Sequence, residues 1–152
     1  MSEQPMRVRG HHLCCSVCFL GSGKETAIEY FGIDNAIPEL AKKIAEAPDT
    51  QIELADTFDD VCDICPIKVP AGCGRGGPTE EGIREQSEKL SVWDRSIFER
   101  LGFSVGERTT FAAVYRRLAE RIPDIGVICT NCTSSKPYGF STYRDGLRML
   151  GS

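Results

Sequence analysis

The sequence contains no long apolar run and no clustered block of basic residues. Its longest nearly apolar stretch, residues 13–20, is far shorter than the roughly 20 residues that a membrane-spanning helix needs. The first ten residues contain no apolar core of the kind that a secretory signal peptide has. The net charge is -4 and the arginines are scattered, so no phosphate-binding track is present. These absences argue against membrane and nucleic-acid partners and predict a cytoplasmic protein.

Internal repeats and low-complexity linkers are also absent. A chain of 152 residues with 41% apolar content is long enough for one packed core. We therefore expect a single cysteine-rich domain over residues 1–152.

Apolar periodicity predicts three helices. They are expected over residues 34–47, from Thr79 to a stop at Gly102, and from after Thr110 to Pro123. The alternating segment "QIELAD" predicts a short strand, and "MRVRG" is a candidate partner for it. The expected fold class is mainly α, with α+β possible: a small helical domain with a short β-hairpin and cysteine-rich loops that converge on one site.

The eight cysteines are the unusual feature of a chain expected to lie in a reducing compartment. Cys62 and Cys65 form one C-x-x-C pair, Cys129 and Cys132 form a second, and Cys73 lies among glycines. A C-x-x-C turn lets two thiolates reach one metal ion or one edge of a cluster. The spacing favours an iron–sulfur cluster over structural zinc, because the pairs are much further apart than in common zinc modules. Thiol–disulfide chemistry is the third possibility.

The stretch "RGHHLCCSVC" contains both histidines of the chain. Adjacent side chains point in different directions in regular structure, so His11 and His12 are not expected to bind one ion together. One of them could ligate or hydrogen-bond a cluster sulfur while the other packs. Cys14 and Cys18 lie in the apolar run and are expected to be buried packing residues.

These motifs resemble those of domain-of-unknown-function family 1284, a family of small bacterial and archaeal proteins. The family opening RGHHLLC corresponds to "RGHHLCC" here, which places Cys15 on the family cysteine. The resemblance continues through "CDICP", "CGRGG" and "VICTNC". It implies iron–sulfur binding but brings no established reaction. The ligands that it implies are Cys15, Cys62, Cys65, Cys73, Cys129 and Cys132.

The combined hypothesis is one iron–sulfur cluster, of the [4Fe–4S] type, held by four thiolates. The first candidates are the two C-x-x-C pairs, with Cys15 and Cys73 as competitors and with His11 and His12 flanking the ligands. The expected role is electron transfer or redox sensing with a redox partner protein. The alternatives are a zinc-stapled structural or binding module, and a metal- or cluster-dependent enzyme that uses the histidine pair. The sequence does not decide whether the protein is an enzyme.

Overall fold

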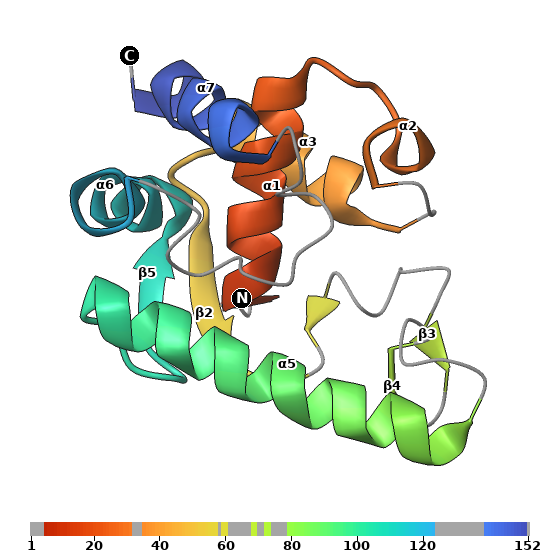
Figure 1. Cartoon of the computed structure of the whole chain (residues 1–152). Helices are drawn as coiled ribbons and strands as arrows, with labels where there is room; N and C mark the ends of the chain where they lie inside the picture. The colour runs from red at the N-terminus through yellow and green to blue at the C-terminus, as the bar shows by residue number, and fades with distance from the viewer. Residues whose placement is uncertain are drawn as a thin grey trace.

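The computed structural model describes residues 5–31, 35–57, 59–60, 68–69, 72–73, 79–123 and 139–151. Figure 1 shows the elements in chain order. The helices are α1 (Gly10–Ser22), α2 (Ala27–Phe31), α3 (Ile37–Glu46), α5 (Glu80–Leu101), α6 (Phe111–Arg121) and α7 (Gly139–Gly151). The strands are β1 (Met6–Arg9), β2 (Gln51–Ala55), β3 (Lys68–Val69), β4 (Gly72–Cys73) and β5 (Arg108–Thr110). The protein is mainly α, as the sequence predicts.

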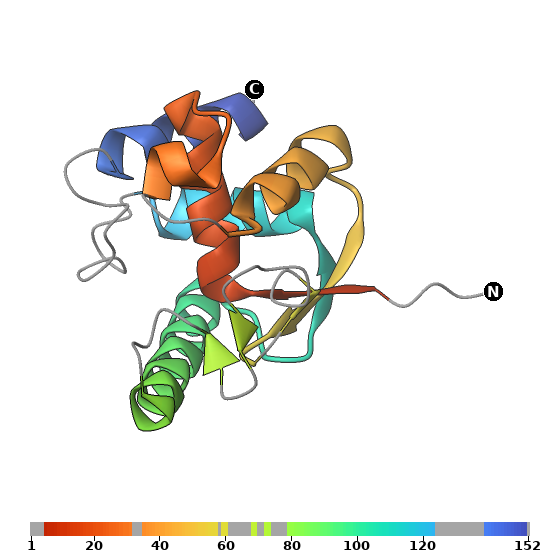
Figure 2. The ribbon, with the colours of Figure 1, turned by 90° about the vertical axis from the view of Figure 1, so that its right-hand side faces the viewer.

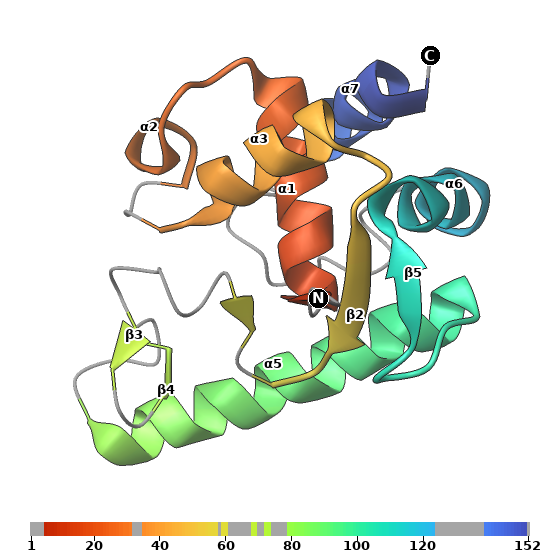
Figure 3. The same ribbon diagram turned by 180° about the vertical axis from the view of Figure 1, so that it is seen from behind.

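Helix α1 is the centre of the fold. It packs against α7, α3 and α5, and Figure 3 shows α3 and α7 beside its C-terminal half. Leu13, Cys14 and Val17 are each at most 1% exposed. The cysteine-rich stretch that contains them is a helix, so it is not one of the cysteine-rich loops that the sequence predicts. A helix that is buried on several sides carries apolar residues all round, so its sequence shows no one-sided helical periodicity.

The crossing of α1 and α7 depends on two glycines. A Cβ atom at Gly146 would overlap the backbone carbonyl of Val17, and one at Gly21 would overlap the backbone carbonyl of Thr142. The two backbones therefore approach more closely than any side chain at these positions would allow. This contact fixes α7 on the central helix.

Three strands form a small sheet in the order β1-β2-β5. The predicted partnership of "MRVRG" with "QIELAD" is confirmed, with Met6 opposite Ile52. The pairing is parallel, however, so these strands do not form a hairpin. The helices α1 to α3 lie between them in the chain and provide the long connection that parallel strands require. A short antiparallel pair occurs instead between β3 and β4.

The three predicted helices are present: α5 and α6 start and α5 ends where expected, whereas α3 starts at Ile37, three residues later than predicted. The side chain of Thr79 accepts a hydrogen bond from the backbone N–H of Gly82 at the start of α5. Gly102 ends that helix with a φ of 79°, in the left-handed region that glycine adopts easily. Thr110 caps α6 in the same way as Thr79 caps α5.

Helix α5 runs beneath the sheet and the start of α1. In Figure 2 the N-terminal end of α1 lies beside α5, where the chain enters from β1. This junction joins β1, α1 and α5.

None of the helices in the described ranges is both long enough and apolar enough to cross a bilayer.

Candidate functional site

Two histidines occupy the first turn of α1, and each is held by a carboxylate from another element. His11 Nδ1 lies 2.6 Å from Asp94 Oδ1 on α5. His12 Nδ1 lies 2.8 Å from Asp59 Oδ2, in the segment that follows β2. The ring centroids of the histidines are 4.3 Å apart. Two imidazole–carboxylate pairs are therefore placed side by side at the junction of α1 and α5.

Arg9 connects these two pairs. Its Nε donates to Asp94 Oδ2 at 2.6 Å, and its backbone N–H donates to Asp59 Oδ2 at 2.7 Å. The side chain of Asp94 is fully buried and also accepts a hydrogen bond from the backbone N–H of His11. Burial alone would raise the pKa of Asp94, but His11 and Arg9 outweigh it and hold that pKa below its usual value. Asp94 is thus a buried carboxylate that stays ionised.

His11 is a neutral imidazole in this setting. Burial lowers its pKa and the neighbouring His12 lowers it further, although Asp94 acts in the opposite direction. Its ring stacks on Trp93, with centroids 5.1 Å apart and an interplanar angle of 13°. Because Nδ1 faces a carboxylate, the proton of the neutral ring is on Nδ1, and the lone pair is on Nε2.

The site supplies nitrogen and sulfur donors. Cys15 follows His12 by three residues and His11 by four on α1, and these helical spacings make Cys15 a neighbour of each histidine on the helix surface. Imidazole nitrogen and cysteine sulfur are the donors that zinc and iron–sulfur centres use. The residues present at this site therefore fit such a group.

The described ranges do not contain a complete ligand set. Within them, no three His, Cys, Asp or Glu side chains form a group that could hold a metal ion. Ligands for a whole centre would have to include side chains from the rest of the chain. The cysteine-rich segments 61–67 and 124–138 are part of that remainder.

The predicted cysteine ligands fall into three groups. Cys62, Cys65, Cys129 and Cys132 lie outside the described residues. Cys73 is described only through its backbone, in strand β4, which contacts α5. Cys15 is buried in α1, one turn after the histidines. Cys14 and Cys18 are also buried in α1, and all three of these cysteines belong to the hydrophobic core.

Sequence reasoning missed three polar members of this site: Arg9, Asp59 and Asp94. A signal for Asp94 was present. It lies four residues after Leu90 and three before Ile97, within the stripe of apolar residues predicted to face inward on α5. An acidic residue within such a stripe indicates a buried carboxylate with a partner. Asp59 had no comparable signal, because it lies in an irregular segment.

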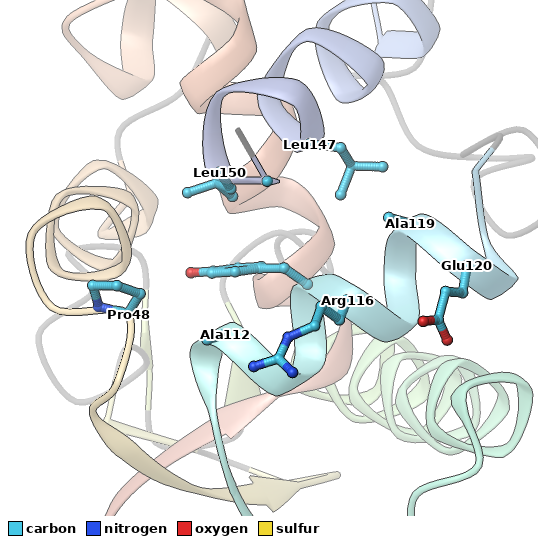
Figure 4. A pocket seen from close by; sticks show the side chains of 9 residues that line it. Pro48, Ala112, Arg116, Ala119, Glu120, Leu147 and Leu150 are labelled. Carbon is cyan, nitrogen blue, oxygen red and sulfur yellow. The ribbon is translucent and has the colours of Figure 1, made fainter.

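A separate pocket lies between α6 and α7 and contains none of the predicted site residues. Its volume is about 440 Å³, and Figure 4 shows Leu147 and Leu150 of α7 on one side and α6 on the other. Tyr115, on the α6 side, is 5% exposed, and its hydroxyl has no hydrogen-bond partner in the described part of the structure. Burial also raises the pKa of Tyr115, so the hydroxyl remains protonated.

Tyr115→Phe is expected to stabilise the protein by about 1 kcal/mol, because it removes a buried donor that has no partner. Tyr143→Phe is the matched control. The Tyr143 hydroxyl is equally buried but donates to the carbonyl of Ile122 at 2.7 Å, so its removal should cost about 1 kcal/mol. Urea unfolding followed by circular dichroism measures both. Equal losses in the two variants would contradict the structure around Tyr115.

The fold and site define a small, mainly helical domain with two imidazole–carboxylate pairs at the start of its central helix. The chain belongs to the DUF1284 family, described as proteins of unknown function, whose model matches residues 33–136. The matched range includes both C-x-x-C pairs, α5 and α6, while the "RGHHLCC" stretch precedes it. No curated protein and no solved structure matches the chain.

Proposed function

We propose that this protein binds an iron–sulfur cluster, of the [4Fe–4S] type, and uses it for electron transfer or redox sensing. The thiolates of the two C-x-x-C pairs are the first candidates for its ligands, and Cys15 and Cys73 compete with them. When bound, the cluster would supply a one-electron redox centre. The protein's own residues would hold it, exclude water and set its potential.

The observation that carries this proposal is the hydrogen bond between His12 and Asp59. Asp59 precedes Cys62 by three residues. The bond therefore attaches the chain just before the first C-x-x-C pair to the first turn of α1. Cys15 lies one turn later on the same helix. His12 therefore contacts a carboxylate that is 47 residues away in the chain and only three residues before Cys62.

Two further contacts position the elements that contain or flank the other candidate cysteines. Strand β4, which contains Cys73, lies against α5, and α5 provides Asp94 and Trp93. Segment 124–138, which contains the second C-x-x-C pair, joins α6 to α7. The hydrogen bond from Tyr143 to Ile122 ties the two helices together across that segment.

Anaerobic purification followed by iron, sulfide and zinc analysis tests the proposal. We expect a brown protein with about four iron and four sulfide per chain. Serine substitution of a ligating cysteine should abolish cluster binding, and Cys62, Cys65, Cys129 and Cys132 are the first to test. Cys18→Ala should retain the cluster, because Cys18 packs in the core. A colourless protein with stoichiometric zinc and no sulfide would overturn the cluster and favour a zinc-stapled module.

We also propose that the protein lies in the cytoplasm and acts with a redox partner protein. A reducing compartment keeps the cysteines available as thiolates. In an electron-transfer role, the cluster would exchange electrons with another protein. Co-purification under reducing conditions would identify such a partner.

A further inference from the structure

We infer that His12 is itself a ligand of the metal centre through its Nε2 atom, and that Asp59 is the positioning residue that holds it there. This inference rests on the proposed function, because it concerns the same centre. It changes the cysteine set, because a [4Fe–4S] cluster takes four protein ligands and His12 would therefore replace one of the thiolates.

The geometry of the His12–Asp59 pair is the first argument. With Nδ1 2.8 Å from a carboxylate oxygen, Nδ1–H is the group that donates to Asp59, so Nε2 is the ring nitrogen through which His12 would bind a metal. Histidines that bind metals almost always donate their other ring N–H to a carboxylate, a carbonyl or water. The carboxylate fixes the ring orientation and raises the basicity of Nε2.

Asp59 is itself held in place. Its side chain is fully buried, and Oδ2 accepts the backbone N–H of Arg9 at 2.7 Å. The carboxylate is thus anchored to the end of β1, directly before α1 begins. A ring that is held by an anchored carboxylate presents Nε2 in one direction.

His12 is favoured over His11 because their surroundings differ. His11 stacks on Trp93, and its carboxylate partner also bonds the guanidinium of Arg9. That group of residues joins α1 to α5 and has a structural role. The partner of His12 instead leads directly into the segment with Cys62, and His12 lies three residues before Cys15 on α1.

Nitrogen labelling tests the inference directly. The wild-type protein, labelled with ¹⁵N-histidine and reduced, should show in pulsed electron paramagnetic resonance the hyperfine coupling of a metal-bound nitrogen. The coupling should persist in His11→Ala and disappear in His12→Ala. Asp59→Asn should keep the coupling but bind the metal about 10- to 100-fold more weakly, because the orientation of His12 is then less well held.

The possible outcomes separate this inference from the proposed function. A cluster without nitrogen coupling in the wild-type protein would overturn the role of His12 and leave the cluster proposal intact. Zinc in place of a cluster would overturn the cluster proposal. X-ray absorption at the zinc edge would then decide the inference: one nitrogen and three sulfur neighbours support it, and four sulfurs overturn it. A protein with no metal of either kind would overturn both.

Discussion

Gly146→Ala is expected to destabilise the protein by about 3 kcal/mol or more, as measured by urea unfolding at 222 nm. A methyl group at this position would overlap the carbonyl oxygen and carbon of Val17, which belong to the backbone of α1. Because backbone atoms cannot rotate away as a side chain does, α1 and α7 would have to separate. The movement would open the core around Tyr143, which is fully buried on α7.

Gly151→Ala provides the control on the same helix. Nothing lies within 4 Å of a Cβ atom at Gly151, so the substitution should be neutral or slightly stabilising, in line with the higher helix propensity of alanine. Gly21→Ala should resemble Gly146→Ala, because it tests the same crossing from the other helix. If Gly146→Ala were as stable as the wild type, the close approach of α1 and α7 would be wrong.

The predicted helices show which parts of this fold are encoded locally. The helices α3, α5 and α6 each bury one face and expose the other, and α5 and α6 also begin at a capping threonine. Periodicity and capping signals were therefore sufficient to find them. Helix α1 has neither signal, since its first residue follows Arg9 without a side-chain cap and its residues are buried on several sides. Its helical state depends on the surrounding elements.

The candidate site was only partly predictable, because it too depends on contacts between distant parts of the chain. His11 and His12 stood out as rare residue types in a distinctive motif, and the structure places both at one junction. Their carboxylate partners are 83 and 47 residues away in the chain. Such pairings arise from tertiary packing, and a single sequence contains no direct record of them. Only a charged residue within an apolar stripe, as at Asp94, provides a hint.

Asp94→Asn is the second substitution with a large expected effect. It should cost about 3–5 kcal/mol, because it removes the charge that balances the buried guanidinium of Arg9, whose side chain is 4% exposed. The amide NH2 would also replace one carboxylate oxygen, so it would face either Arg9 Nε or the backbone N–H and Nδ1 of His11, all of which need an acceptor. Urea unfolding of the purified variant measures the loss.

Two comparisons show whether the loss comes from the buried charge. Asp145→Asn removes a carboxylate that is 51% exposed and lies 3.7 Å from Arg148, so it should cost less than about 1 kcal/mol. In the double variant Arg9→Met with Asp94→Leu, the unpaired charge is gone, and part of the stability should return. A loss below about 1 kcal/mol in Asp94→Asn would mean that the Arg9–Asp94 pair is not buried as the structure places it. A double variant less stable than Asp94→Asn would mean that the carboxylate's hydrogen bonds to His11, rather than its charge, hold the start of α1 on α5.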